Sequence, residues 1–555
     1  MKDFSLIRYP ELVFGIAGPI GIEIDELCDT LKAALHRVGY SSVIIRVTDE
    51  IAAVPSTIPE PKGTGFHSVM RHKMAHANAI CSEAGDAARL MRYVIEAIRR
   101  ERAEFNDPDQ QLIDDPAPGD DSSLLPQSES GESIPFVALN REDVVRQKVA
   151  YIVRQIKRPA EIDLLRNVYN EQFVLISAYG AEADRRKVVE DEVRRTARSN
   201  TSEAAIAARV QELLTRDQSE DNNEHGQKLR EAFHRADVFV DGISKSSMEA
   251  KITRFINALF GANDVAPTKS EYGMFTAASA ALRSSDLSRQ VGAALLTDQG
   301  KVLAQGCNEV PKAFGGTYWD TEEPDFRDVK LGSDPNERFK QDILKDLIEK
   351  MEDAGLLSEK ALSLGKDSHI ATRLLRSDHD ESGAGCLNDS KISDLTEYGR
   401  VVHAEMNTIC DAARIGRAIA GSVLYCTTFP CHNCTKHILA SGIKQVFFME
   451  PYPKSKAKQL HHNEVELEKP SSSRVSFMPF MGVAPNRYKA IFKKAKRKSG
   501  GVATRWYHGD PCPMIDVLTT KYLEIEKYAI APLIGTIVPG QDAIPAEATG
   551  PSATT

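Results

Sequence analysis

The most informative residues of this chain lie in two short stretches, Val401-Val402-His403-Ala404-Glu405-Met406 and Pro430-Cys431-His432-Asn433-Cys434. His403, Cys431 and Cys434 offer one nitrogen and two sulfur ligands, with which a tetrahedral Zn²⁺ keeps one position open for water. Glu405 is not needed as a ligand and is spaced to move protons. A structural zinc site is the alternative, but it needs a fourth protein ligand, and none has the expected spacing. The pattern therefore predicts a catalytic zinc centre.

The sequence around these stretches alternates between expected helices and strands. The helical or strand patterns cover residues 401–409 (helix start), 421–428 (strand), 431–441 (helix) and 443–448 (strand). The i, i+3 spacing of Cys431 and Cys434 puts both sulfurs on one helical face. The amino end of that helix also favours thiolates, because its dipole and free amides stabilise negative charge. We expect a β-α-β-α-β order around the metal.

The H-x-E…P-C-x-x-C pattern is the signature of zinc nucleobase deaminases, and residues 271–452 resemble the deoxycytidylate deaminase family. Arg289–Leu296 is similar to that family's first core strand. Val302–Pro311 is similar to its second strand, which ends in a G-x-N-x-x-P pattern. The resemblance implies a cytidine-deaminase-like α/β/α domain, in which zinc provides a hydroxide nucleophile and Glu405 transfers the protons.

The same resemblance implies substrate contacts. Asn308 of the G-x-N-x-x-P pattern corresponds to the asparagine that contacts the deoxyribose 3′-hydroxyl, and the alternative is a turn asparagine before proline. Backbone amides around Ala404 and Thr428 are expected along the pyrimidine edge. Tyr452 either packs near the base or fills the core of a loop.

The amino-terminal part opens with a strand, a glycine turn, a helix and a second strand, over residues 12–17, 18–21, 23–38 and 42–47. This order resembles a P-loop nucleoside or nucleotide kinase, with Gly15, Gly18 and Gly21 at the turn. A working P-loop continues with lysine and a hydroxyl residue, whereas Gly21 is followed by Ile22-Glu23-Ile24-Asp25. These acids would repel a polyphosphate at the helix amino end. An ordinary α/β turn explains the pattern about as well.

Later segments extend the resemblance. Residues 173–178 and 235–242 have the pattern of buried strands. Arg185 and Arg186 stand where P-loop kinases keep their lid arginines, or they belong to a solvated helix face. We expect residues 1–262 to form a degenerate P-loop kinase-like three-layer domain, with a regulatory role and no kinase activity.

Polar and turn-forming segments predict the domain organisation. Gly261-Ala262-Asn263-Asp264 before Pro267 marks a boundary, which gives a deaminase domain over 266–500 and a carboxy-terminal extension over 501–555. Residues 106–133 are expected to be a disordered loop, and those from about 539 a flexible tail. An insertion over about 317–398 is expected to be a lid or an oligomer contact. His369, His379 and Cys386 within it are candidates for a second metal, although their spacing is irregular.

Composition limits the class of protein. The net charge of −9 over 555 residues argues against a surface that binds nucleic acid throughout. Nine cysteines without a signal peptide indicate reduced thiols in the cytoplasm. No apolar run approaches the roughly 20 residues of a membrane span. The basic run Lys493–Lys498 contacts triphosphate, RNA or an acidic partner, or it is a solvated helix end.

A degenerate P-loop domain ahead of a deoxycytidylate deaminase domain resembles the bacterial anti-phage dCTP deaminases. That resemblance implies a zinc enzyme, and a homo-oligomer, that converts free dCTP and often dCMP to deoxyuridine nucleotides and so deprives a phage of a DNA precursor. A regulatory RNA or a nucleotide effector is an expected partner. The alternatives are a housekeeping dCMP deaminase that supplies dUMP, a polynucleotide cytidine deaminase, and a nucleotide sensor without turnover.

Overall fold

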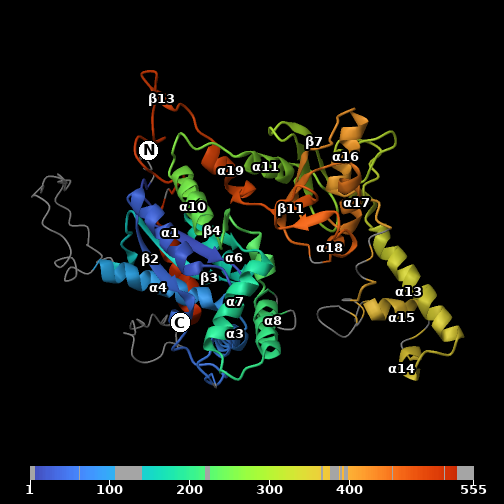
Figure 1. The fold of residues 1–555 in the computed structure, drawn as a ribbon, viewed down its shortest axis with the longest axis horizontal. Helices are drawn as coiled ribbons and strands as arrows, with labels where there is room; N and C mark the ends of the chain where they lie inside the picture. The colour runs from blue at the N-terminus through green and yellow to red at the C-terminus, as the bar shows by residue number, and fades with distance from the viewer. Residues whose placement is uncertain are drawn as a thin grey trace, which may run out of the picture. The chain divides into compact units, whose positions relative to one another are not determined.

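The computed structural model describes residues 7–61, 63–106, 140–218, 220, 225–363, 365, 367–375, 385, 387, 390–392, 395, 398–452, 454–517 and 519–533. The expected loop 106–133, except for Asn106, and the expected tail lie outside this range. The chain divides into two compact units, one of Met1–Ala266 with Met481–Thr555 and one of Pro267–Phe480 (Figure 1). The second unit is therefore an insertion, in sequence, between two parts of the first.

The boundary expected at residue 500 lies instead at residue 480, and residues 501–533 are not a separate extension. Strand β12 (Gly482–Val483) pairs antiparallel with β5 (Val238–Asp241) of the first unit. Helix α19 (Pro485–Phe492) follows, and Arg487 on it contacts Asp237 through its Nε, 3.1 Å from Oδ1. Backbone pairing and this ion pair thus hold the chain after residue 480 in the first unit.

The first unit contains a six-stranded sheet in the order β12-β5-β4-β1-β3-β2. Its other strands are β1 (Leu12–Ala17), β2 (Ser41–Arg46), β3 (Val149–Ile156) and β4 (Phe173–Tyr179), all parallel to one another and to β5. All six residues of β1 are buried, as expected for a parallel strand with both faces covered. The mixed α/β class expected from the sequence is confirmed.

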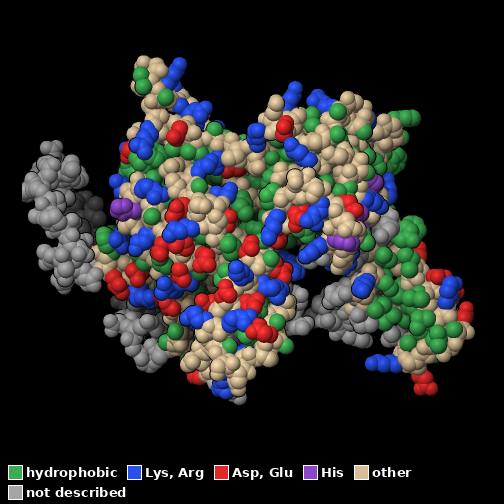
Figure 2. Space-filling model, in the orientation of Figure 1, with side chains coloured by type: hydrophobic (Ala, Val, Ile, Leu, Met, Phe, Trp, Pro, Cys, Tyr) green, Lys and Arg blue, Asp and Glu red, His purple; other side chains and the backbone are tan. Residues whose placement is uncertain are grey.

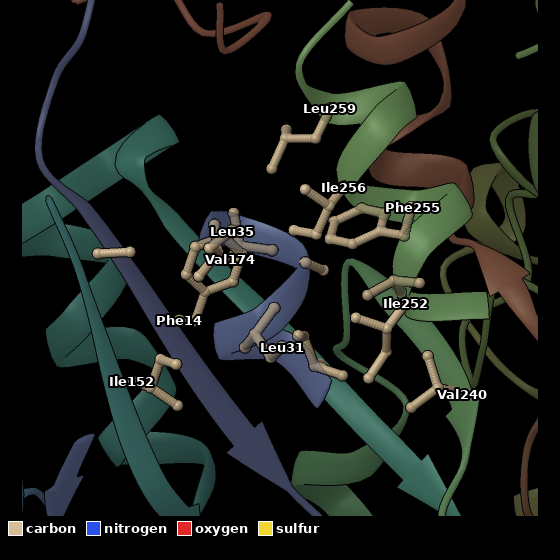
Figure 3. Close-up of a cluster of buried hydrophobic side chains, with 14 of the residues drawn as sticks. Phe14, Leu31, Leu35, Ile152, Val174, Val240, Ile252, Phe255, Ile256 and Leu259 are labelled. Carbon is tan, nitrogen blue, oxygen red and sulfur yellow. The ribbon is translucent and has the colours of Figure 1, made fainter. Parts of the chain in front are cut away.

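The helices of the first unit are α1 (Ile24–Arg37), α2 (Val47–Glu50), α3 (Phe66–Glu83), α4 (Arg89–Phe105), α6 (Pro159–Tyr169), α7 (Glu182–Thr196), α8 (Glu203–Gln218), α9 (Leu229–Phe233), α10 (Lys245–Leu259), α19 and α20 (Tyr522–Ile530). Figure 3 shows Leu31 and Leu35 of α1 and Ile252 and Phe255 of α10 directed toward the sheet residues of one core. The i, i+4 spacing of Leu31 and Leu35 puts both on the same helical face.

The glycine turn between β1 and α1 is occupied by a side chain of the chain itself. The Asp217 carboxylate accepts the N–H of Ile20 at 2.6 Å and pairs with Lys157 Nζ at 2.7 Å. Lys157 Nζ also donates to the carbonyl of Gly18 at 2.7 Å. Gly21 has a φ of +90°, and a Cβ there would lie 2.6 Å from the carbonyl oxygen of Arg185. A carboxylate thus fills the position at which a P-loop would meet an anion.

A buried ion cluster connects the carboxy-terminal helix α20 to the rest of the first unit. Arg102 on α4 is fully buried between two acids: its Nη2 lies 2.9 Å from Glu11 Oε2, and its Nη1 lies 2.8 Å from Glu526 Oε2. Tyr169 donates to the Glu526 carboxylate, and Tyr522 donates to that of Glu11. Buried charges require such pairing, because an unpaired one pays the full desolvation cost.

The second unit is built on a six-stranded sheet in the order β10-β11-β9-β8-β6-β7. The strands are β6 (Gly292–Leu296), β7 (Val302–Cys307), β8 (Val423–Thr428), β9 (Gln445–Glu450), β10 (Val465–Leu467) and β11 (Val475–Pro479). Strand β6 runs antiparallel to β7 and β8, whereas β8, β9, β11 and β10 are parallel. Its helices are α11 (Lys269–Ala281), α12 (Asp328–Leu331), α13 (Pro335–Asp353), α14 (Glu359–Leu362), α15 (Asp367–Leu375), α16 (Ala404–Arg414), α17 (His432–Ala440) and α18 (Ala457–Leu460).

Two small residues on neighbouring strands show that helices cover both faces of this sheet. Gly292 on β6 meets the backbone of α11, and Gly306 on β7 meets Thr408 of α16. Ala293 pairs with Gly306 and shares its face, so Gly292, one residue earlier, faces the opposite side. Helices α11 and α16 therefore lie on opposite faces, in an α/β/α arrangement.

The insertion expected at 317–398 contains α12 to α15. Leu344 and Ile348 of α13 pack against Ile370 and Ala371 of α15 in a small core of their own. The candidates for a second metal, His379, Cys386 and the side chain of His369, lie outside the described residues. Among the helices described here, none is long and apolar enough to cross a membrane.

Candidate metal centre and substrate pocket

Two helix amino ends bring the expected ligands together. His403 is the residue before the first turn of α16, and Cys431 occupies the same position before α17. The thiol sulfur of Cys431 accepts the backbone N–H of Cys434 at 3.4 Å, which fixes both sulfurs on the first turn of α17. The β-α-β-α-β order expected around the metal is observed as β7, α16, β8, α17 and β9, with helices α12 to α15 of the insertion between β7 and α16.

The three ligand atoms are close enough to hold one metal ion. The Nδ1 atom of His403 lies 3.3 Å from Cys431 Sγ and 3.5 Å from Cys434 Sγ. A tetrahedral zinc with Zn–S of about 2.3 Å and Zn–N of about 2.1 Å separates sulfur from nitrogen by about 3.6 Å. Within the described residues, no other group of three or more His, Cys, Asp or Glu side chains is close enough to hold a metal ion. The donor set and its spacing fit zinc.

The protonation states of these groups are coupled. Hydrogen bonds from Cys434 and then His403 lower the pKa of Cys431 to about 4. The hydrogen bond with Cys431 in turn raises the pKa of His403 to about 9. The pKa of Cys434 is raised well above its ordinary value, first by its hydrogen bond to the Cys431 sulfur and then by burial. Metal binding requires the deprotonated forms of all three ligands and therefore releases protons.

Glu405 lies in the first turn of α16, two residues after the ligand His403. Its side chain is buried, with 4% of the residue exposed. Burial is the main cause that raises the pKa of its carboxyl group, against the opposing effect of His403. A carboxyl group whose pKa is shifted toward neutrality can both accept and return a proton near the working pH. Glu405 therefore has the placement and the environment of a proton carrier.

A pocket of about 930 Å³, open solvent at its mouth included, lies in front of these residues. It is lined by Asp286, Leu287, Ser288, Arg289, Val291, Asn308, Asp328, Asp334, Asn336, Gly399, Arg400, Val401, His403, Glu405, Thr428, Phe429, Cys431 and Tyr452. The sequence singled out His403, Glu405, Cys431, Asn308, Thr428 and Tyr452 separately, and the fold brings all six to this one pocket.

Asn308 is buried and uses both ends of its side-chain amide. Its Oδ1 accepts the backbone N–H of Ala404 at 2.8 Å, and its Nδ2 donates to Asp286 Oδ2 at 2.9 Å. The Ala404 amide, which was expected along the pyrimidine edge, is therefore directed to Asn308 instead. Thr428 Oγ1 lies 3.4 Å from Glu450 Oε2 at the end of β8.

Several pocket residues were not found by sequence reasoning. Arg289 forms an ion pair with Glu450, and Arg400 Nη1 lies 2.7 Å from Asp328 Oδ1. Asn336 comes from α13 of the insertion, where its Nδ2 donates to the carbonyl of Leu395 at 2.8 Å. The place of Arg289 in the pocket could have been predicted, because it is a charged residue at the start of an apolar strand pattern. The places of Asp328 and Asn336 could not, because no sequence pattern in the insertion relates these residues to the metal ligands.

The chain was compared with known proteins. Residues 267–450 match the family described as the cytidine and deoxycytidylate deaminase zinc-binding region. The deoxycytidylate deaminase of Enterobacteria phage T4 is 47% identical over 55 residues, 10% of this chain and 28% of that protein. ComE operon protein 2 of Bacillus subtilis (strain 168) is 32% identical over 94 residues, 16% of this chain and 50% of that protein.

The human deoxycytidylate deaminase is 41% identical over 54 residues, 10% of this chain and 29% of that protein. The chain thus spans half or less of the length of each of these curated relatives. The crystal structure of the dCMP deaminase from cyanophage S-TIM5 in apo form aligns with 39% of this chain and 100% of that chain, at 20% identity and a TM-score of 0.19. The part of the chain that matches the cytidine and deoxycytidylate deaminase zinc-binding region, residues 267–450, lies within the second unit.

Proposed function

We propose that this protein is a zinc-dependent deaminase that converts free dCTP, and also dCMP, to dUTP and dUMP with release of ammonia. The observation that carries the proposal is the buried carboxyl group of Glu405, which lines one pocket with the ligands His403 and Cys431. A site that only binds nucleotide has no use for a buried proton carrier beside a metal. This argues against a zinc-stabilised sensor without turnover.

The chain's own residues account for the proton transfers of such a reaction. When bound by the three ligands, zinc supplies a Lewis acid that lowers the pKa of a coordinated water. Glu405 takes one proton from that water and delivers it to the ring nitrogen next to the amino-bearing carbon. It then delivers the second proton to the departing amine, so that cytosine and water become uracil and ammonia.

Three pocket residues are assigned to the sugar and the phosphates. We assign the deoxyribose 3′-hydroxyl to Asn308, which lines the pocket with its partner Asp286. Arg289 and Arg400 are the two arginines that line the pocket, and each forms an ion pair with an acid. Guanidinium groups fixed in this way are suited to phosphate oxygens. Tyr452 is assigned to the surroundings of the base.

The insertion is proposed to act in assembly as well as in the pocket. It supplies Asp328, Asp334 and Asn336 to the pocket wall. Large apolar side chains remain exposed on it or just before it, namely Phe314, Trp319, Phe326, Leu331, Leu347 and Leu356. Exposed apolar surface of this kind marks contact sites between proteins. It supports a homo-oligomer that forms through the insertion.

The first unit is proposed to be a kinase-like domain that regulates the deaminase and does not transfer phosphate. The turn after β1 has no lysine or hydroxyl at the positions that would hold phosphate and Mg²⁺. Asp217 and Lys157 fill that turn from within. A regulatory unit of this size fits an enzyme that must stay silent until infection, and we propose anti-phage depletion of deoxycytidine nucleotides as the biological role. A housekeeping dCMP deaminase remains the second candidate, since the relatives named above include deoxycytidylate deaminases.

A substrate panel tests the proposed reaction. Purified protein is incubated with dCMP, dCTP, cytidine and single-stranded DNA, and the ammonia released is assayed. Release from dCTP and dCMP, but not from cytidine or DNA, is the expected result. Release from dCMP alone favours the housekeeping enzyme, and release from DNA alone overturns the proposal. Measurement of cellular dCTP with and without phage tests the role in defence.

A further inference from the structure

A short hairpin after α19 concentrates positive charge in an acidic chain. Residues 493–505 contain six Lys or Arg and no Asp or Glu, whereas the whole chain has a net charge of −9. The hairpin consists of β13 (Lys498–Ser499) and β14 (Val502–Ala503), which pair antiparallel. Gly500 and Gly501 form the turn with φ values of 55° and 86°, the left-handed backbone that a two-residue hairpin turn requires.

The base of this hairpin is built into the first unit. Asn263 donates its backbone N–H to the carbonyl of Arg505 at 2.9 Å, and Tyr507 donates its own to the carbonyl of Gly261 at 2.8 Å. Lys494 Nζ donates to the carbonyl of Ala262. Figure 1 shows the hairpin projecting beyond these anchors, and Figure 2 shows Lys and Arg side chains along it. Residues 493–505, called the arm below, therefore have a fixed place on the first unit and are not a frayed helix end.

Five cations of the arm have no acidic partner among the residues that the structure describes. Within the described part of the chain, no ion pair involves Lys493, Lys496, Arg497, Lys498 or Arg505, and all five are exposed. Elsewhere in the first unit most exposed arginines are paired, as Arg194 is with Glu190 and Glu203. Like charges on a two-stranded ribbon repel one another, so the arm lacks the counter-charge that would stabilise it.

We propose that this arm binds the phosphodiester backbone of a nucleic acid. The ribbon is narrow, since Ser499, Gly500, Gly501 and Ala503 carry small side chains or none, and a two-stranded ribbon fits a nucleic-acid groove. Cations on both strands then contact phosphates. A membrane surface fits less well, because Val502 is the single large apolar residue at the tip and the arm has no apolar face to insert. The proposal does not depend on the proposed deamination.

Binding through the backbone predicts a strong dependence on salt. Five phosphate contacts give a slope of log K against log salt of about −4.5 for a duplex and about −3.5 for a single strand. The affinity for a duplex then falls about 500-fold between 50 and 200 mM salt. Binding of free nucleotide would give a much smaller slope.

The test measures fluorescence anisotropy of labelled 30-residue single-stranded RNA, single-stranded DNA and duplex DNA with the full chain. Replacement of Lys493, Lys496, Arg497 and Lys498 by Gln removes four charges from the arm. The matched control replaces Lys32, Lys73, Lys187 and Arg198 by Gln, which removes the same charges from exposed residues outside the arm. In the arm variant, the affinity is expected to fall and the magnitude of the slope of log K against log salt to decrease by about 3 to 4. In the control variant, the affinity and the slope are expected to equal those of the unchanged chain.

The outcomes separate the possible sources of the ligand. Preference among the three probes identifies RNA, DNA or any phosphodiester chain as the partner. Equal weakening in both variants, or no binding of any probe at 50 mM salt, overturns the proposal. Arm-dependent binding to vesicles of phosphatidylcholine and phosphatidylserine, without binding to nucleic acid, overturns it as well. Zinc content and melting temperature equal to those of the unchanged chain show that the variants fold.

Discussion

Asn308 Oδ1 accepts the backbone N–H of Ala404 over 2.8 Å, at the first residue of α16. Ala404 lies between His403, the proposed metal ligand, and Glu405, the proposed proton carrier. One side-chain amide thus satisfies a free N–H at a helix start and fixes the two residues on which the chemistry depends. A change in the position of Asn308 would therefore affect both the start of α16 and any contact of Asn308 with the sugar.

Replacement of Asn308 by Ala is expected to leave zinc in place and to lower kcat/KM for dCMP and dCTP. The change leaves the buried Ala404 N–H and the Asp286 carboxylate without this partner, which costs about 1–3 kcal/mol, or about 5- to 150-fold in rate. Zinc analysis and steady-state kinetics measure the two effects. An unchanged kcat/KM for both nucleotides would contradict the assigned role.

Replacement of Glu405 by Gln keeps the shape of the side chain and removes its ability to carry a proton. Loss of a general acid–base is expected to reduce deamination by about 10²–10⁴-fold, with zinc retained. The matched control is Asp411→Asn, on the same helix, whose side chain pairs at the surface with Arg414. Wild-type turnover in the Glu405 variant would show that another group moves the protons.

Replacement of Cys431 or Cys434 by Ala should release zinc and lower the melting temperature of the second unit, because part of the metal-binding free energy is folding free energy. Prolonged treatment of the wild-type protein with a chelator should have the same effect on stability. Cys410→Ala is the control, since Cys410 is an exposed cysteine of α16 that is not a ligand. A full equivalent of tightly bound zinc in both ligand variants would refute the ligand assignment.

Replacement of Glu526 by Gln leaves Arg102 with a single acidic partner, Glu11, in a fully buried position. Breaking a buried pair in this way typically costs about 3–5 kcal/mol. We expect urea unfolding to show a free energy of unfolding of the first unit that is lower by this amount. Glu524→Gln, on the exposed side of the same helix, should change the free energy of unfolding by less than about 1 kcal/mol. Equal effects of the two substitutions would argue against the buried cluster.

The regulatory role of the first unit is tested with the second unit alone. The appropriate fragment is residues 267–480, because residues 481–533 belong to the first unit and would be left without their partners. We expect this fragment to bind zinc and the full chain to show no phosphoryl transfer from ATP or GTP. In cells, toxicity or constant activity of the fragment identifies the first unit as a restraint, and a folded but inert fragment identifies it as an activator.

The regulatory role would be refuted if the fragment protects cells as well as the full chain does and shows no deaminase activity before infection. Soluble expression and zinc content are the controls, because a fragment that does not fold says nothing about regulation. A fragment from residue 266 to the end of the chain is the comparison, and it is expected to be the less soluble of the two.

Local patterns predicted the parts of the structure that local physics determines. The strand expected at 12–17 is β1, and the helix expected from 431 is α17, because alternation, buried apolar runs and helix-end residues act over a few positions. The three candidate metal ligands, whose ligand atoms the fold brings together, were selected by type and spacing. The pocket's Asp328 and Arg400 pair across 72 residues of insertion, and no periodicity encodes such a partner.

The same limit explains the misplaced domain boundary. Residues 481–533 have ordinary helix and strand patterns, and only their partners Asp237 and Arg102, hundreds of residues earlier, assign them to the first unit. The Ala404 amide is a further case, since its hydrogen-bond partner depends on how β7 approaches α16. Sequence reasoning thus identified the chemical groups of the site better than the contacts that hold them.

The Arg102–Glu526 pair joins residues that are 424 positions apart in the chain. A ribosome makes the chain from its amino end, so Arg102 leaves the exit tunnel long before the helix that neutralises it exists. The whole of the second unit is synthesised in that interval. The zinc domain can therefore complete its folding first, while the unit that begins the sequence waits for its last helix and Arg102 has Glu11 as its acidic partner in the meantime.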